Sequence, residues 1–144
     1  MRGTATVQVN SDGLIIGAAS SFHGIVQSIA NGVNKLAGKK VTLSAFISGV
    51  SGTGKGVLAL SNGSNASNLG TTIEHEDFSS PGLITFTTVV PSTLEKDYLN
   101  FWVHVPDNNN FGYTITAAKL ELGDTQTLAH LENGVWVLNE IPNY

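Results

Sequence analysis

The chain has 144 residues, enough for one domain with its own core, because a chain of this size buries about two thirds of its unfolded surface on folding. Charged residues make up only 12% of the chain and the net charge is −4. Since Lys39-Lys40 is the sole pair of adjacent basic residues, the sequence offers no basic surface to the phosphates of nucleic acid. The absence of cysteine excludes disulfide bonds and thiolate chemistry.

Short segments in which apolar and polar residues alternate follow one another along the chain, and such alternation predicts β-strands with one buried face. Turn-forming residues separate these segments, as at Asn10–Gly13 and Pro81-Gly82. In chain order, we expect strands at residues 4–9, 14–17, 22–29, 41–48, 57–60, 69–75, 83–90, 97–105 and 113–122, with one more short strand at 135–138. We therefore predict an all-β fold, a two-sheet antiparallel β-sandwich of jelly-roll type with about eight to nine strands.

All of these strands except the short one at 135–138 lie in the first 124 residues, so we expect a jelly-roll domain at 1–124 and a C-terminal extension or connector at 125–144. The apolar run at 14–19 is far shorter than the roughly 20 residues of a membrane helix. It also lacks the basic flank and the length of a signal-peptide core. We expect neither membrane insertion nor a signal peptide.

The alternation changes phase within the segment 113–122. Ile115 and Ala117 fall on one parity, whereas Leu120 and Leu122 fall on the other. One extra residue in a strand produces such a change, so we predict a β-bulge near Ala118-Lys119.

The strand at 97–105 carries information on both of its faces, because successive side chains of a strand point to opposite sides. One side is apolar and fits a core; it consists of Leu99, Phe101, Val103 and Val105. The other side mixes rings with hydrogen-bonding groups; it consists of Tyr98, Asn100, Trp102 and His104. Such a face suits a sugar, which presents apolar C–H surfaces and many hydroxyls. The alternative is that the rings pack under a loop or a second sheet.

Other aromatic residues offer two ways to extend or replace this face. Phe46 points outward from the strand at 41–48, and it extends the glycan platform if that strand lies in the same sheet. Alternatively, Phe78, Phe111 and Tyr113 form a site from loops at the edge of the sandwich. The sequence leaves the choice between face and edge open.

The segment Gly49–Gly56 nearly matches the phosphate-binding pattern G-x-x-x-x-G-K-[ST]. The residue after Lys55 is Gly56, so the hydroxyl that would bind Mg²⁺ is missing, and no helix is expected to follow. We interpret the segment as a flexible hairpin loop.

The run Glu74-His75-Glu76-Asp77 places three carboxylates around a histidine, a combination found in metal sites and acid/base pairs. In an extended chain His75 points away from Glu74 and Glu76, so we interpret the run as a solvated strand end. Neither a Gly-x-Ser-x-Gly motif nor a Cys-His pair is present. We expect no catalytic residues, no metal site and no cofactor.

Three segments of the chain resemble segments of known proteins. Residues 36–49, LAGKKVTLSAFISG, resemble a strand of carbohydrate-binding jelly-roll modules. Residues 115–124, ITAAKLELGD, are similar to the closing strand of these domains in phage and prophage tail fibres. Residues 126–142, QTLAHLENGVWVLNEIP, are similar to the connector that follows in tail proteins of gut Firmicutes prophages. In glycan-binding relatives acidic residues of the closing strand help to bind calcium, and Ala117-Ala118-Lys119 stands here instead, so the resemblance implies no calcium.

The resemblance implies a non-catalytic module of a phage tail fibre or baseplate that recognises a bacterial cell-surface glycan. It places the protein in the virion, acting at the host cell surface, and a homo-oligomer is expected, with a trimer favoured because fibres often use cyclic symmetry. The alternative that we keep is a structural or oligomerisation module of a tail fibre without glycan binding of its own.

Overall fold

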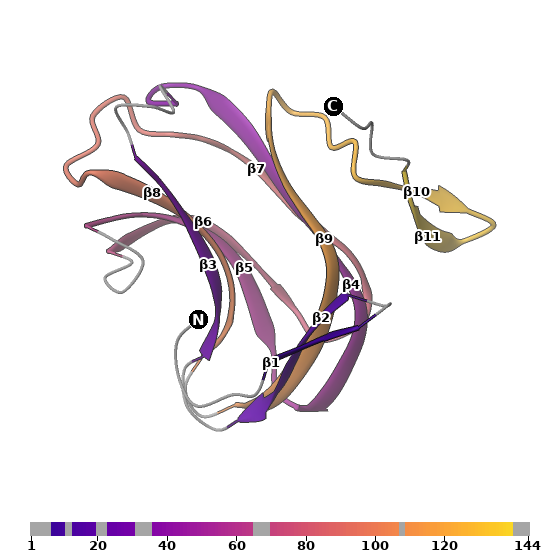
Figure 1. The fold of residues 1–144 in the computed structure, drawn as a ribbon. Coiled ribbons are helices and arrows are strands. Elements are labelled where there is room, and N and C mark those ends of the chain that lie inside the picture. Colours follow the sequence, from indigo (N-terminus) through magenta and orange to yellow (C-terminus); the bar gives the residue numbers. More distant parts are fainter. Residues whose placement is uncertain are drawn as a thin grey trace.

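The computed structural model of the chain describes residues 7–10, 13–19, 23–30, 36–64, 70–106 and 109–139, and they form antiparallel sheets (Figure 1). One sheet has the strand order β1 (Val7–Asn10), β2 (Gly13–Ala19), β9 (Asn110–Leu122), β4 (Lys40–Thr53) and β7 (Gly82–Val89). The other has the order β3 (His23–Ala30), β8 (Tyr98–Val105), β5 (Gly56–Gly63) and β6 (Thr71–Phe78). This arrangement confirms the predicted two-sheet jelly-roll sandwich. Within these ranges no helix has the length and apolarity to cross a membrane.

The core lies between the two sheets and follows from the alternation of their strands. On β8, the expected inward side is buried, with exposed fractions between 0% and 9%; it consists of Leu99, Phe101, Val103 and Val105. Alternate residues of β4 and β5 meet them in the same apolar cluster; these are Val41, Leu43, Ala45 and Ile47, and Leu58 and Leu60. Burial of each Val, Leu, Ile or Phe side chain in this cluster stabilises the fold by roughly 1.5–3 kcal/mol relative to exposure.

The predicted bulge in β9 is present, but it lies nearer the start of the strand than Ala118-Lys119. In the pairing with β4, Phe46 is opposite Ala117 and Ile47 is opposite Ile115, so the extra residue is Thr116. The predicted position is wrong because Ala117 and Ala118 are both small. The change of phase therefore becomes visible in the sequence only at Leu120.

A two-stranded hairpin follows the sandwich, formed by β10 (Ala129–Glu132) and β11 (Val135–Leu138), which confirms the short strand expected at 135–138. Figure 1 shows the hairpin beside the five-stranded sheet, on the side facing away from the other sheet. The backbone N–H and the hydroxyl of Thr127 both donate to the Glu121 carboxylate, at 2.9 Å each. Lys119 Nζ donates to the Thr127 hydroxyl at 2.6 Å. Side chains of β9 therefore tie the extension to the sandwich, while the boundary at residue 124 stays a prediction.

The close approach of Gly56 to Phe78 provides a test of the core at one end of the sandwich. A Cβ atom at Gly56 would overlap the Phe78 ring, which is 5% exposed and packed in the core. We expect Gly56→Ala to lower the free energy of unfolding by about 1–3 kcal/mol, because the ring must move within a packed core. Urea unfolding measures the change. Gly49→Ala is the matched control, since a Cβ there would meet Thr114 only at ordinary contact distance; an equal loss in both variants would contradict the prediction.

Candidate ligand-binding pocket

The outer face of the four-stranded sheet, the side turned away from the five-stranded sheet, holds a pocket above Trp102. Cross-strand pairing aligns His75 of β6, Ala59 of β5 and Trp102 of β8 in one row. The next row aligns Asp77, Val57 and His104 in the same order. Because β5 contributes only small side chains here, a hollow of about 190 Å³ remains between β6 and β8. We call it the Trp102 pocket; it is lined by Lys55, Val57, Ala59, Thr72, His75, Asp77, Trp102 and His104.

The floor of the Trp102 pocket is aromatic. The rings of Trp102 and His104 are stacked, with centroids 3.8 Å apart and an interplanar angle of 28°. Both residues are mostly buried, with exposed fractions of 8% and 7%, and Trp102 packs against Val57, Ala59 and Val26. The two rings therefore form a recessed floor.

The wall of the pocket is polar and charged. Lys55 Nζ donates to Asp77 Oδ2 at 2.8 Å, and His75 Nδ1 lies 3.2 Å from Asp77 Oδ1. The hydrogen bond from Lys55 is the main cause that lowers the pKa of Asp77 below its ordinary value of 3.8. Partial burial opposes this shift, while the charge of Lys55 and the contact with His75 add to it. At neutral pH the wall therefore presents an ionised carboxylate beside an ammonium group.

The structure brings together only part of the face expected from β8. Trp102 and His104 line the pocket, but Asn100 is completely buried and accepts a hydrogen bond from Ser28 Oγ at 2.6 Å. Tyr98 is half-buried at the start of the strand and does not line the pocket. Asn100 therefore supports the sheet beneath the surface, out of reach of a ligand in this pocket.

Phe46 lies in the other sheet and cannot extend this face. Its strand, β4, pairs with β7 and β9 in the five-stranded sheet. The neighbouring residues Ala45 and Ile47 are in the core, so Phe46 is on the outer side of that sheet. Phe46 would extend the glycan platform only if its strand lay in the same sheet as Trp102, and it does not.

The three rings expected in edge loops are core residues. Phe78, Phe111 and Tyr113 have exposed fractions of 5%, 2% and 2%. Phe78 makes edge-to-face contacts with the other two rings, with centroids 5.9 and 5.7 Å apart. Tyr113 Oη donates to the Val103 carbonyl at 2.7 Å, which links the two sheets. The expectation of a loop site was wrong because these residues belong to β6 and β9 and point between the sheets.

Sequence reasoning missed the wall residues Lys55, His75 and Asp77. Lys55 lies in the turn between β4 and β5, in the segment interpreted as a flexible loop, and the two strands are longer than expected. His75 and Asp77 are two residues apart in β6 and therefore share a face. That spacing was visible in the sequence, but the pairing of β6 with β5, which carries both residues to the pocket, was not.

The comparisons with known proteins bear on the fold. No protein-family model matches the chain, and no curated protein matches it. Among solved structures, the chain is similar to the C-terminal family 22 carbohydrate-binding module of Clostridium thermocellum Xyn10B, with a TM-score of 0.53 and 14% sequence identity. The match covers 82% of this chain and 79% of that module, in which amino acids in a cleft take part in ligand binding. The chain thus has the fold of a carbohydrate-binding module.

The Lys55–Asp77 pair predicts a specific dependence of stability on pH. Because the folded-state pKa of Asp77 is below 3.8, the pair stabilises the fold at pH values above 3.8. This contribution is lost as the pH falls below that value through the lowered pKa. We expect wild type to exceed Asp77→Asn in free energy of unfolding at neutral pH by less than about 1 kcal/mol, since the pair is about half exposed.

Urea unfolding of both proteins at neutral and strongly acidic pH measures this difference. The matched control is Asp124→Asn, whose carboxylate is 69% exposed and 3.9 Å from Lys40 Nζ. We expect this control to change stability little. A difference between wild type and Asp77→Asn that grows as the pH falls would show that the sign is wrong.

Proposed function

We propose that this domain binds a glycan in the Trp102 pocket. The observation that carries the proposal is the stacked pair of Trp102 and His104 beneath a wall of Lys55, His75 and Asp77. An aromatic floor fits the C–H faces of a sugar ring, and charged donors and acceptors fit its hydroxyls. Pockets that bind small molecules commonly combine an apolar lining with a few polar groups in this way. The likeness in fold to a carbohydrate-binding module supports the same conclusion.

The proposal in its finer form is a module of a phage tail fibre or baseplate that recognises a surface polysaccharide of a bacterial host. The resemblance of residues 36–49, 115–124 and 126–142 to segments of such proteins supports it. Display of several copies on one virion would strengthen binding, because linked sites gain affinity from their high effective concentration. A weak interaction in each pocket is then sufficient for attachment.

The proposed function is recognition without catalysis. Lys55 stabilises the ionised form of Asp77, so this carboxylate accepts hydrogen bonds and is a poor proton donor at neutral pH. His75 contacts the same carboxylate. These contacts hold the side chains of Asp77 and His75 at the wall of the pocket, where they are placed to bind sugar hydroxyls.

Replacement of His75 tests the pocket without disturbing the core, because its side chain is 54% exposed. We expect His75→Ala to weaken glycan binding about fivefold, through the loss of one polar contact. Migration through native gels containing purified host polysaccharide measures the affinity. Quenching of Trp102 fluorescence in the Trp136→Phe variant, which keeps one tryptophan, reports whether the ligand reaches the floor.

His130→Ala is the matched control, since this histidine is 50% exposed on the hairpin. It should bind as wild type does. A wild-type domain that no host polysaccharide retards, or equal loss of binding in both variants, would remove the assignment to the Trp102 pocket.

A second candidate function is self-association within a fibre, which the exposed apolar side chains of the hairpin favour. Leu131 and Val135 have exposed fractions of 58% and 63%. If they form contacts between copies, the wild type sediments as a trimer and Leu131→Asp sediments as a monomer. Leu122→Asp is the control, because Leu122 is 68% exposed outside the hairpin. A wild-type domain that is monomeric at every concentration in sedimentation velocity would exclude this candidate.

A further inference from the structure

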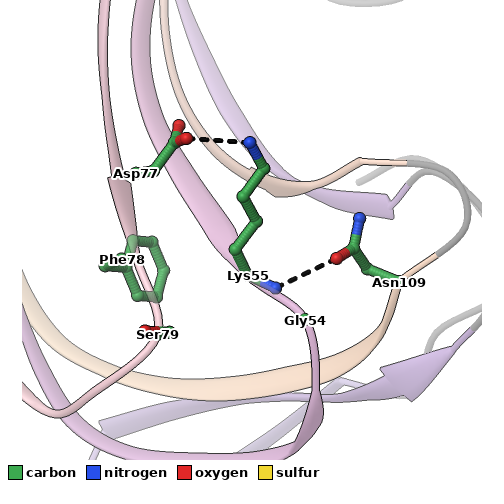
Figure 2. A pocket seen from close by; sticks show the side chains of 6 residues that line it. All are labelled: Gly54, Lys55, Asp77, Phe78, Ser79 and Asn109. Atoms are coloured by element: carbon green, nitrogen blue, oxygen red, sulfur yellow. Dashed lines mark hydrogen bonds and ion pairs between the residues drawn. The ribbon is translucent and has the colours of Figure 1, made fainter.

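A second hollow adjoins the Trp102 pocket, and Figure 2 shows the residues that line this second hollow. It has a volume of about 370 Å³ and is lined by Gly54, Lys55, Asp77, Phe78, Ser79 and Asn109. We call it the Asn109 pocket. Lys55 and Asp77 line both hollows, so the ion pair between them lies where the two pockets meet.

The Asn109 pocket is held in shape by contacts between two connections of the chain. Asn109 Oδ1 accepts a hydrogen bond from the backbone N–H of Lys55 at 3.1 Å, and Asn109 Nδ2 donates to the Pro106 carbonyl at 3.3 Å. Gly54 has a φ of +108°, and a Cβ atom there would overlap the Asn109 side chain. The close approach of backbone and amide therefore requires glycine. A site built in this way needs little ordering when a ligand binds.

The polar groups of the Asn109 pocket suit hydroxyls better than anions. An ammonium group has three N–H donors and a carboxylate has about four acceptor sites, so the ion pair can still bind ligand hydroxyls. Ser79 adds an exposed side chain with a hydroxyl. The charges of Lys55 and Asp77 cancel, and an acidic sugar that approaches Lys55 is repelled by Asp77, 2.8 Å from the ammonium.

We propose that the two pockets form one extended site, which holds at least two consecutive sugar units of an uncharged glycan across the Lys55–Asp77 ion pair. This inference rests on the proposed function and specifies its ligand class. One sugar unit lies over Trp102 and the next lies beside Asn109. The ion pair offers its donors and acceptors to both units.

The length of the ligand provides the first test. The probes are fragments of one to six sugar units, obtained by partial acid hydrolysis of the polysaccharide that retards the wild-type domain. Isothermal titration should show that fragments of two or more units bind at least about tenfold more tightly than the single sugar. Ser79→Trp fills the Asn109 pocket and should abolish the gain in affinity of the longer fragments. Ser80→Trp is the control, because Ser80 is exposed and does not line the pocket, and it should preserve the gain.

The results separate this inference from the proposed function. If His75→Ala weakens binding while Ser79→Trp binds all fragments as wild type does, the Trp102 pocket binds glycan and the extended site is wrong. If no fragment and no polysaccharide binds the wild type, the proposed function fails and the extended site fails with it.

The charge of the ligand provides the second test, with dextran as the uncharged probe and polygalacturonate as the acidic probe in native gels. Polygalacturonate should not retard the wild type more than dextran does. Asp77→Asn leaves the Lys55 charge unbalanced and should shift retardation towards polygalacturonate, whereas Lys55→Met should not. Preferential retardation of the wild type by polygalacturonate would overturn the assignment to uncharged glycans.

Discussion

The packing of β8 against its neighbours determines both the core and the pocket. Val103 is buried between the sheets, while Trp102, the residue before it, forms the floor of the pocket on the other side. Since side chains alternate, a shift of one residue in the pairing of β8 with β5 would exchange the two faces. The apolar cluster that contains Val103 thus holds Trp102 in place opposite Ala59. The geometry of the proposed glycan site therefore depends on the same strand register as the core.

The Lys55–Asp77 pair adds little to stability and much to the character of the surface. Exposed ion pairs contribute at most about 1 kcal/mol. Lys55 lies in the β4–β5 turn and Asp77 lies in β6, so their 2.8 Å contact joins two parts of the chain at the border of the two pockets. The pair supplies opposite charges side by side among lining residues that are otherwise uncharged, both polar and apolar. This combination makes the wall polar without giving it a net charge.

The parts of the structure that could be predicted from the sequence are those that depend on neighbouring residues. The alternation of 97–105 correctly separates Leu99 from Trp102, and the change of phase in 113–122 correctly indicates a bulge. What depends on strand pairing could not be predicted. Phe46 alternates as an outward residue should, but its sheet is determined by pairing with β7 and β9. Likewise, His75 reaches Trp102 only because β5 lies between their strands.

The same limit explains the errors at the edge of the sandwich. Phe78 follows a run of charged residues and precedes two serines, so its surroundings in the sequence are those of a loop. The structure buries its ring because Gly56, which has no side chain, leaves room for it, and Tyr113 packs against it edge to face. The fit between the Phe78 ring and Gly56 involves residues far apart in the chain, so it cannot be predicted from the pattern of neighbouring residues.

The attachment of the C-terminal extension has a mechanical consequence. Thr127 forms hydrogen bonds with Glu121 and Lys119 of β9, and the backbone N–H of Asn139 donates a hydrogen bond to the Leu128 carbonyl. A pull on residue 139 therefore passes through the hairpin into β9, which lies inside the five-stranded sheet between β2 and β4. The Trp102 pocket is built on the opposite sheet, so tension applied at residue 139 enters the sheet that does not carry the pocket.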